Sequence, residues 1–481
     1  MNMNSDNIVN NIENEVINKI LVSLCSENTE LYLVGGYIRD LILDRRGYDR
    51  DYAIKGESAA EFAKKAAEFF NGYYVLLDKD FDIARVIMPD KKNTLDFASC
   101  VKQDIYEDLA RRDYTINAIA YRIDGEKSGL IDPHNGANDI NNKIIRAISE
   151  QNLIDDPLRL LRAFRFAAQL NFNIEDKTLN YIKTHKSLIN RVSVERINVE
   201  LVKLFESNHT AVNLDLMKNI EFLDEILPEI SIQRKIPPNL HHHLGLLDHS
   251  IETVKQLEIN VQDMPEWVKE RLNQEPAANI KLVSLLKIAG LLHDIGKPST
   301  WQIDELGRHR FIKHEEIGAE QAVDILKRLR FSKNSIKYMT KIIKYHLYPS
   351  QLLKSDEEVT EKAILRMFRK IGEETPEILL IAMADRLSAR GPEITENIVN
   401  NNIKGLYWLL EKYKESLEKE EALPKLLSGH EVMEILDLPR GTEVGRVLKA
   451  LKEAQISGDV NTKEEAINFA KGYEYKKKET E

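Results

Sequence analysis

The sequence L-V-G-G-Y-I-R-D spans residues 33–40, and D-R-D follows at residues 49–51. The glycine pair sits between a short apolar run and a helical pattern, so it predicts a turn where backbone N–H groups can face a phosphate. The D-R-D run alternates like a strand, which places its two carboxylates on one side, about 7 Å apart. This spacing suits two Mg²⁺ ions with positions open for triphosphate oxygens. Together the motifs indicate a nucleotide bound through metal ions.

A third motif, R-R-D-Y-T-I-N-A, occupies residues 111–118. A single glycine pair is usually a turn and a single D-x-D is usually a solvated loop, so neither carries much weight alone. All three motifs in this order, within the first quarter of the chain, are far harder to obtain by chance. On these motifs the chain resembles the class II tRNA nucleotidyltransferase and poly(A) polymerase family of the DNA polymerase beta superfamily, from about residue 31 to its C-terminus.

The resemblance and the element pattern together predict an α+β protein. Strand-like runs alternate with helical ones up to about residue 145, and everything beyond has a helical pattern. The chain is long enough for about three or four packed units. We expect, in order, a nucleotidyltransferase head (residues 1–146), a helical neck that selects the base and binds RNA (147–235), an HD domain (236–393) and a helical tail (394–481).

The resemblance implies how the head would handle a nucleotide. Asp49 and Asp51 would hold two Mg²⁺ ions that bridge the triphosphate and activate an RNA 3′-hydroxyl for in-line attack. Asp96, on a later strand, is either a third carboxylate of this site or a strand-end acid. The other motif residues would bind the phosphates and the sugar, where an amide can detect a 2′-hydroxyl. These nucleotide-binding residues are Gly35, Gly36, Arg39, Arg112, Asp113 and Asn117.

The family reads the incoming base with a helix that carries E-D-x-x-R. The matching stretch here is D-D-P-L-R, at the start of a helix predicted over residues 155–170. Asp156 and Arg159 are three residues apart and share one helix face. The carboxylate would accept from the exocyclic amine of C or A, and the guanidinium would donate to ring acceptors, so U and G would be rejected. Arg162 and Arg165 continue the series of arginines that begins at Arg159. They either grip the triphosphate or tRNA, or form a solvated face.

A second set of metal-ligand residue types lies in the C-terminal half. The order His249, H-D-I-G-K at residues 293–297, and Asp385 resembles the HD superfamily of metal-dependent phosphohydrolases. A divalent transition metal or Mg²⁺ would generate hydroxide there and polarise a phosphoryl oxygen. The resemblance implies the ligands His249, His293, Asp294 and Asp385, with His314 and His346 where two-metal members of the superfamily place further ligands.

Two features beside these ligands have other expected roles. Lys297 would contact a substrate phosphate, and the resemblance suggests 2′,3′-cyclic or terminal phosphates on damaged RNA ends as substrates. The histidine run 241–243 precedes the first helix of the HD domain, and we interpret it as cap or loop residues.

The bulk composition limits the setting in which the protein works. No apolar run reaches about 18 residues and no signal-peptide core is visible, so neither a membrane span nor secretion is expected. Two cysteines make no disulfide framework, which fits a reducing cytoplasm. The net charge of −10 argues against indiscriminate coating of nucleic acid. A helical stretch at 327–344 has seven Lys or Arg and no acid, and it is either a solvated face or a contact to an RNA backbone.

The leading hypothesis is an enzyme that adds C and A to the 3′ ends of tRNA from CTP and ATP. Between Asp96 and Arg111 the chain leaves little room for the flexible loop of complete CCA-adding enzymes, so addition of CC alone stays open. Poly(A) polymerase is a weaker alternative, because the run at residues 76–81 lacks that branch's basic pair before an aromatic residue. A different class is an HD phosphohydrolase whose head senses nucleotides. The oligomeric state does not follow from the sequence.

Overall fold

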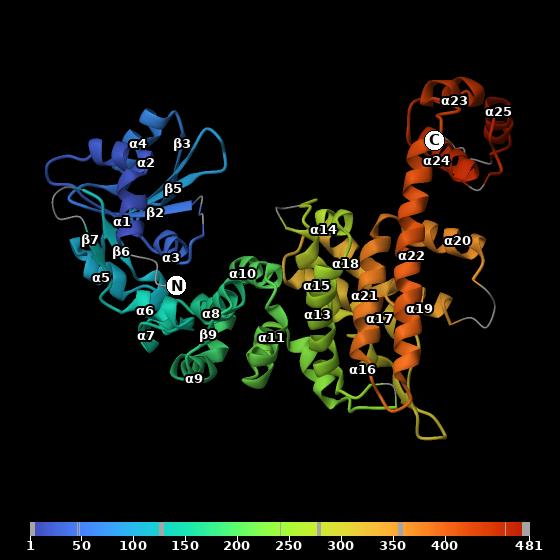
Figure 1. The fold of residues 1–481 in the computed structure, drawn as a ribbon, viewed down its shortest axis with the longest axis horizontal. Helices are drawn as coiled ribbons and strands as arrows, with labels where there is room; N and C mark the ends of the chain where they lie inside the picture. Colours follow the sequence, from blue (N-terminus) through green and yellow to red (C-terminus); the bar gives the residue numbers. More distant parts are fainter. Residues whose placement is uncertain are drawn as a thin grey trace, which may run out of the picture.

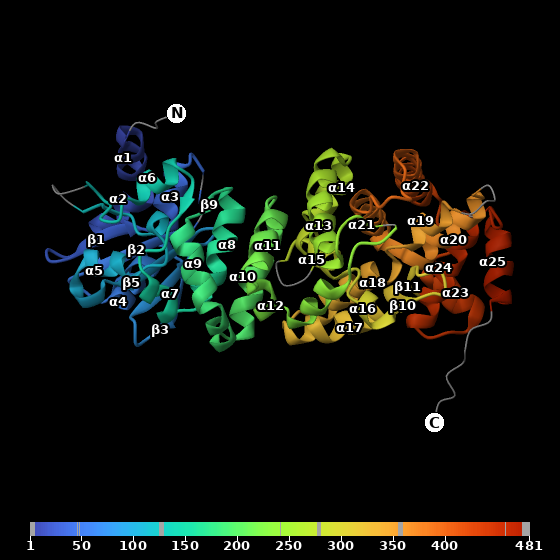
Figure 2. The same cartoon turned by 90° about the horizontal axis from the view of Figure 1, so that it is seen from below.

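The computed structural model describes residues 5–45, 47, 49–124, 129–240, 242–276, 280–354, 359–456 and 458–473. A mixed sheet with its helices forms the N-terminal end of an elongated molecule, and helices make up the rest (Figure 1). Seen from below, the parts follow one another along the long axis in sequence order (Figure 2). The expected α+β fold class is therefore confirmed.

The head contains one seven-stranded sheet in the order β3-β4-β5-β2-β1-β6-β7. Its central strand β2 pairs with β1 in antiparallel and with β5 in parallel orientation. The strands are β1 (Glu30–Val34), β2 (Asp49–Lys55), β3 (Tyr73–Asp78), β4 (Ile83–Ile87), β5 (Thr94–Ser99), β6 (Ala120–Arg122) and β7 (Gly129–Ile131). The helices are α1 (Ser5–Asn14), α2 (Val16–Ser23), α3 (Gly36–Ile42), α4 (Ala59–Phe70), α5 (Ile105–Ala110) and α6 (Gly136–Asn141).

One face of this sheet is buried beneath α4. Tyr52 of β2 and Phe97 of β5 stack with ring centroids 5.2 Å apart, and Phe62 of α4 meets Phe97 edge-on at 5.4 Å. All three side chains are almost fully buried, and burying one large apolar side chain stabilises a fold by about 1.5–3 kcal/mol. Because side chains alternate along a strand, this packing turns Asp49 and Asp51 to the opposite face.

The neck and the HD domain are built from helices with short strand pairs. Neck helices are α7 (Glu150–Asp155), α8 (Leu158–Leu170), α9 (Asp176–His185), α10 (Val194–Glu206), α11 (Thr210–Asn219) and α12 (Phe222–Ile226). The HD helices are α13 (Leu246–Asp263), α14 (Glu266–Leu272), α15 (Leu282–Leu292), α16 (Lys297–Thr300), α17 (His314–Arg328), α18 (Lys333–Tyr345), α19 (Tyr348–Leu352), α20 (Glu361–Ile371) and α21 (Thr375–Ser388).

Three sequence-based expectations about this half are corrected in part, although α8 ends at Leu170 as expected and most of residues 327–344 is helical. The helix predicted over 155–170 begins only at Leu158: Asp156 is extended (φ −132°, ψ 92°), because the following Pro157 disfavours helical geometry at the residue before it. The region is not all helical, since β8 (Ile144–Ile145) pairs with β9 (Asn173–Ile174), and β10 (Trp301–Ile303) pairs with β11 (His309–Phe311). The basic stretch 327–344 spans two helices, α17 and α18, which are separated by a turn at Arg330 (φ 61°).

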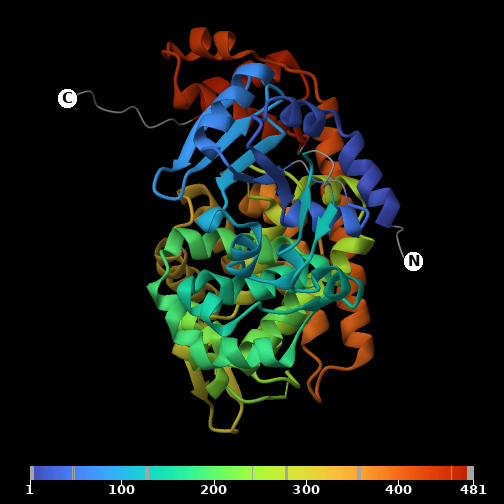
Figure 3. The same ribbon diagram turned by 90° about the vertical axis from the view of Figure 1, so that its left-hand side faces the viewer.

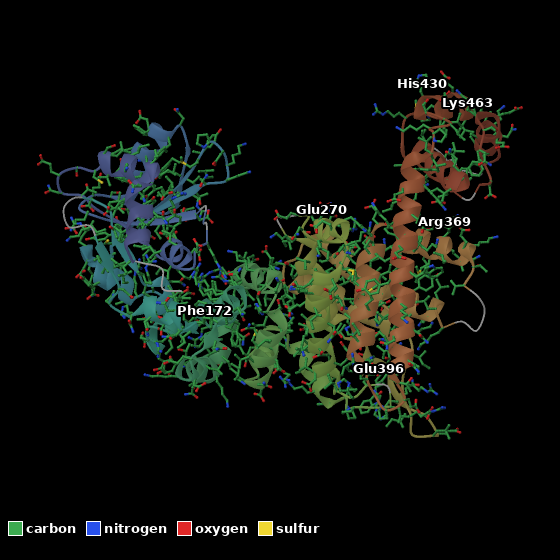
Figure 4. All side chains as sticks on the ribbon, in the orientation of Figure 1. Phe172, Glu270, Arg369, Glu396, His430 and Lys463 are labelled. Atoms are coloured by element: carbon green, nitrogen blue, oxygen red, sulfur yellow. The ribbon has the colours of Figure 1, made fainter. Side chains whose placement is uncertain are left out.

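The tail has its own small apolar core. Its helices are α22 (Glu396–Ala422), α23 (Gly429–Leu436), α24 (Thr442–Ile456) and α25 (Lys463–Gly472). Val432, Val447 and Ala466 belong to a cluster separate from the main core, which runs from the head to Tyr413 of α22. His430 of α23 and Lys463 of α25 project from the end of the tail (Figure 4). In a view along the long axis, the tail helices lie behind the head (Figure 3). No helix among the described residues is long and apolar enough to span a membrane.

Candidate functional site

All twelve residues predicted for the head and neck site line one cavity of about 520 Å³. The cavity lies between the open face of the sheet and α8. Those twelve residues are Gly35, Gly36, Arg39, Asp49, Asp51, Arg112, Asp113, Asn117, Asp156, Arg159, Arg162 and Arg165. Sequence reasoning assigned no binding role to the other four lining residues, which are Tyr37, Asp40, Gly47 and Phe166.

The turn between β1 and α3 requires glycine at position 35. Gly35 has φ 75°, a left-handed conformation that L side chains rarely adopt. A Cβ atom there would lie 2.9 Å from Arg112 Nη1 and 3.5 Å from Asp51 Oδ2. The bare backbone therefore lets a guanidinium and a carboxylate approach from two other elements.

The two aspartates of β2 form an acidic edge of the cavity. Asp49 Oδ1 accepts a hydrogen bond from Thr94 Oγ1 at 2.6 Å. Burial raises the pKa of Asp51, the charges of Asp96 and Asp49 raise it further, and Arg112 opposes them. Such crowding of negative charge suits a divalent cation held between the carboxylates. Asp96, the alternative third carboxylate, is paired bidentately with Arg85 at 2.6 and 2.7 Å.

Head and neck meet through a chain of ion pairs at the cavity wall. Arg162 of α8 donates to Asp113 at 2.8 Å, and Asn117 Nδ2 donates to the same carboxylate at 3.1 Å. Burial alone would raise the pKa of Asp113, but Arg162 and these hydrogen bonds lower it to about 2. Arg39 Nη1 donates to Asn117 Oδ1 at 2.7 Å, so the residues of three motifs form one network.

Phe166 forms the base of a cationic wall. Its ring is almost fully buried, and the guanidinium groups of Arg165, Arg162 and Arg39 lie 3.9, 5.1 and 5.4 Å from its centroid. Cation–π contacts hold the guanidinium planes in place. Each guanidinium also pairs with a carboxylate, Arg39 with Asp40, Arg162 with Asp113 and Arg165 with Glu200. The cavity therefore offers oriented guanidinium N–H donors opposite the aspartates, which suits phosphate oxygens. The sequence offered one indication of this role, since Phe166 is an aromatic residue next to a series of arginines.

The two predicted base-reading residues are held by other partners. Arg159 Nη1 donates to the backbone oxygens of Arg111 at 2.8 Å and Asn152 at 3.0 Å. Asp156 accepts from Arg196 Nη2 at 3.0 and 3.1 Å, whereas Arg159 Nε is 3.9 Å from Asp156. Sequence reasoning gave Arg196 no binding role.

The six predicted ligands of the HD domain converge at a second, buried site. His249 Nε2 lies 3.1 Å from Asp385 Oδ1 and 3.4 Å from Asp294 Oδ2. His314 Nε2 and His346 Nε2 lie 3.1 and 3.8 Å from Asp294 Oδ1. Two triads could each hold an ion, His249–His293–Asp385 and His293–Asp294–His346. The sequence order H…HD…D therefore corresponds to one three-dimensional cluster.

The donor atoms at this cluster are prepared for a metal. The Nδ1 atoms of His293, His314 and His346 donate to backbone oxygens at 2.7–2.8 Å, which directs each Nε2 toward the cluster. Burial lowers the pKa of His346 to about 3, so its imidazole is neutral, whereas the carboxylates of Asp294 and Asp385 outweigh burial and raise the pKa of His293 to about 10. Within the described part of the chain, none of those Nε2 atoms makes a hydrogen bond, whereas Asp294 Oδ2 is ion-paired with Lys297 Nζ at 2.5 Å. Buried ring nitrogens without hydrogen bonds fit a bound divalent cation.

His242 is the residue of this centre that the sequence did not reveal. It lies in a loop, as expected, but its ring packs against His249 at 4.4 Å between centroids. Its Nε2 is 3.3 Å from Lys297 Nζ, and Lys297 contacts Asp294 at 2.5 Å. Burial lowers the pKa of His242 to about 2, with Lys297 as the next cause. His241, which we also interpreted as a cap or loop residue, lies outside the described residues.

Three family models match separate parts of the chain. The model described as "Poly A polymerase head domain" matches residues 31–146. The model "Probable RNA and SrmB- binding site of polymerase A" matches residues 171–233. The model "HD domain" matches residues 246–390.

Two curated relatives match nearly the whole chain. An A-adding tRNA nucleotidyltransferase of Deinococcus radiodurans is 33% identical over 91% of this chain and 94% of its own length. A CC-adding tRNA nucleotidyltransferase of Thermus thermophilus is 34% identical over 92% of this chain and 93% of its own length.

Solved structures share the fold along the whole chain. A Thermotoga maritima CCA-adding enzyme complexed with tRNA has a TM-score of 0.62 and 20% identity, covering 97% of this chain and 98% of its own. A CCA-adding enzyme with ATP has a TM-score of 0.62 and 21% identity, covering 95% and 94%.

Substituting Gly35→Ala should weaken the binding of CTP in the presence of Mg²⁺ by at least about tenfold, since the left-handed backbone strain is about 1–3 kcal/mol and the Cβ displaces Arg112. Isothermal titration calorimetry measures the affinity. The matched control is Gly129→Ala, where no atom lies within 4 Å of the new Cβ. Equal affinities for the two variants would contradict the proposed close approach.

The Asp113 carboxylate should make the stability of the protein depend on pH. Its pKa falls from 3.8 to about 2 on folding, so its contribution of about 2 kcal/mol is present above pH 4 and lost as the pH falls toward 2. Asp113→Asn removes this titration, and its free energy of unfolding should decline less between pH 4 and pH 2. Urea unfolding followed by circular dichroism measures the difference. Parallel declines in both proteins would refute the assignment.

Removing one ligand of the HD centre should empty it without affecting the head. We expect His249→Ala and Asp385→Ala to weaken Mn²⁺ binding at least about tenfold, because each loses a donor from a buried cluster. Metal content by plasma mass spectrometry and titration with Mn²⁺ provide the measurement. The matched control His430→Ala removes an exposed imidazole of the tail. The assignment fails if all three variants bind Mn²⁺ equally.

Proposed function

The chain belongs to the tRNA nucleotidyltransferase family, and we propose that it builds the 3′-terminal CCA of tRNA, in whole or in part, from CTP and ATP. One observation carries the proposal: all twelve predicted residues of the nucleotidyltransferase motifs line a single cavity. The cavity has an acidic side for metal ions and a cationic side for a triphosphate.

In this proposal the residues of the cavity position the reactants, because nucleotidyl transfer depends mainly on placement and charge. Two Mg²⁺ ions held by Asp49 and Asp51 would supply charge neutralisation and activate the 3′-hydroxyl. Gly35 lets the triphosphate approach the backbone, and Arg112 binds its oxygens. Asn117 presents its amide to the ribose.

Base selection would use Asp156 and Arg159 without a template. The carboxylate accepts from the amine of C or A, and the guanidinium donates to a ring acceptor. In the structure, Arg196 donates to Asp156, and Arg159 donates to backbone oxygens. A correct base would replace those contacts, whereas U or G would leave buried polar groups unpaired, which costs on the order of a few kcal/mol.

A split pathway is a second candidate, and the relatives favour it. The two relatives named above carry partial activities in their names, one A-adding and one CC-adding, at nearly equal identity. The segment between Asp96 and Arg111 holds only the end of β5, a short 3₁₀ turn and α5. It offers no long loop of the kind expected in a complete CCA-adding enzyme.

Each of the four parts of the chain would have its own role. We propose that residues 1–146 carry the transfer chemistry, 147–235 select the base, 236–393 hold a metal-dependent phosphohydrolase centre and 394–481 help to hold the tRNA. The HD centre would act on phosphates at damaged RNA 3′ ends. Its support is the convergence of six metal-ligand side chains beside Lys297.

Incubation of the protein and Mg²⁺ with three tRNAs tests the proposal. The tRNAs lack three, two or one of the 3′-terminal residues, and each receives labelled CTP, ATP or both. Two C additions followed by one A would establish a complete CCA enzyme. A stop after two C residues, or addition of A alone to the longest tRNA, would establish one half of a split pathway.

The double variant Asp49→Ala/Asp51→Ala is the control, and it should abolish incorporation because no carboxylate remains for the metal ions. Long A tails on any RNA would instead make the protein a poly(A) polymerase. Absence of incorporation by the unmodified protein would refute the proposal and favour an HD phosphohydrolase with a nucleotide-sensing head.

A further inference from the structure

One face of the head's sheet packs against the layer that contains α4. On the opposite face, α5 covers residues of β1, β2 and β6, whereas the part formed by β5, β4 and β3 is open. Tyr52, Val86 and Phe97 point to the covered face and are buried against the layer that contains α4. Their neighbours in sequence point to the other face, because side chains alternate along a strand. The opposite face therefore carries Asp49 and Asp51, and its open part continues beyond them.

The strand register fixes two parallel rows on this face. Asp49 pairs with Thr94, Thr94 with Ile87, and Ile87 with Tyr73. The second row joins Asp51, Asp96, Arg85 and Val75 in the same way. Paired residues on neighbouring strands project from the same face. Each row thus runs from a catalytic aspartate on β2 across β5 and β4 to the edge strand β3.

The far end of these rows is apolar and accessible. Tyr73 is 61% exposed and Val75 is 38% exposed, although both side chains are large and apolar. Ile87 is half-buried between them and the acidic residues. We call Tyr73, Val75 and Ile87 the β3–β4 platform. Edge strands normally carry charges where they face solvent, so exposed apolar residues there indicate a binding surface.

The platform and the nucleotide cavity lie on opposite sides of β2. The cavity is built from the turn after β1, the segment before β6, and α8, all on the β1 side of β2. The platform lies on the β5 side, at the sheet edge nearer to the tail (Figure 1). In-line transfer places the attacking oxygen opposite the leaving group. The RNA end must therefore reach Asp49 and Asp51 from the side of the platform.

The charges along the rows permit such an approach. Asp96 lies between Asp51 and the platform, and its negative charge would repel an RNA phosphate. Arg85 neutralises it through two hydrogen bonds of 2.6 and 2.7 Å. Beyond this pair the surface is apolar up to the edge of the sheet, which suits the faces of nucleobases.

We propose that the single-stranded 3′ end of the acceptor RNA lies across β5, β4 and β3, with its bases stacked on the β3–β4 platform. This inference rests on the proposed nucleotidyl transfer. Three strand spacings separate β2 from β3, roughly 14 Å, so Tyr73 contacts a base upstream of the reacting nucleotide. Stacking accepts any base, which suits an RNA end whose last residue changes after each addition.

The test compares Tyr73→Ala with Tyr73→Phe and Leu76→Ala. The phenylalanine keeps the aromatic ring, and Leu76 is another exposed apolar residue (45%) that points to the other face of the same strand. Steady-state C addition to a tRNA that lacks its last three residues gives separate KM values for tRNA and for CTP. Loss of one stacking partner should raise the KM for tRNA by roughly 5- to 100-fold with the KM for CTP unchanged.

A second readout needs no catalysis. An RNA hairpin with a three-nucleotide 3′ overhang carries 2-aminopurine, a fluorescent base, at the second or third position from its end. Binding to the unmodified protein or to Tyr73→Phe should quench the fluorescence, because the base stacks on the ring. Tyr73→Ala should leave it unquenched, and Leu76→Ala should behave like the unmodified protein.

The two readouts separate failure of this inference from failure of the proposed function. If the unmodified protein adds C but Tyr73→Ala keeps its KM for tRNA and its quenching, the platform does not bind RNA. If no nucleotide is added but quenching depends on Tyr73, only the proposed reaction is wrong. If Tyr73→Ala instead abolishes self-association in ultracentrifugation and keeps RNA binding, the platform contacts another copy of the chain and the inference is overturned.

Discussion

The ion pair between Asp113 and Arg162 joins the head to the neck across the nucleotide cavity. The Asp113 side chain is almost fully buried and the Arg162 side chain is 31% exposed, so loss of the guanidinium would leave a buried carboxylate without its charged partner. Arg162 also lies 3.6 Å from Glu200, which pairs with Arg165, so the neck helices α8 and α10 share the contact. The orientation of α8 relative to the sheet, and with it the width of the cavity, depends on this charge network.

Under the proposed function, this constraint would let one cavity hold a triphosphate and read a base. The network fixes the cationic wall, where Phe166 holds three guanidinium groups in place. The base-reading pair lies just outside it, at the start of α8. Pro157 keeps Asp156 out of the helix, which leaves its carboxylate free to turn toward Arg196 or toward a base. A rigid phosphate site and an adjustable base site are thus built from consecutive turns of one chain.

The sequence revealed motifs whose chemistry is local, and it missed partners that only the fold brings together. The glycine turn, the D-x-D strand and the H…HD…D order were found because each depends on short spacing or on residue type. Sequence reasoning did not identify Arg196 and His242, because a contact across about 40 residues, or between a loop and a helix, leaves no periodic pattern in the sequence. The late start of α8 was predictable from Pro157, because a proline disfavours helical geometry at the residue before it. This effect outweighs the helical spacing of apolar residues on which the earlier start was based. The two-residue strands β8 and β9 are too short to show alternation.

The acidic composition is compatible with the proposed RNA substrate because the structure neutralises its charges locally. A net charge of −10 opposes long-range attraction of a polyanion, so recognition must depend on short-range contacts. On the open face of the sheet the only described carboxylate between the metal-binding aspartates and the platform is paired with Arg85. Stacking against apolar side chains requires no net positive charge. The same acidity limits binding to RNA elsewhere on the surface, and this favours ends that can enter the site over RNA in general.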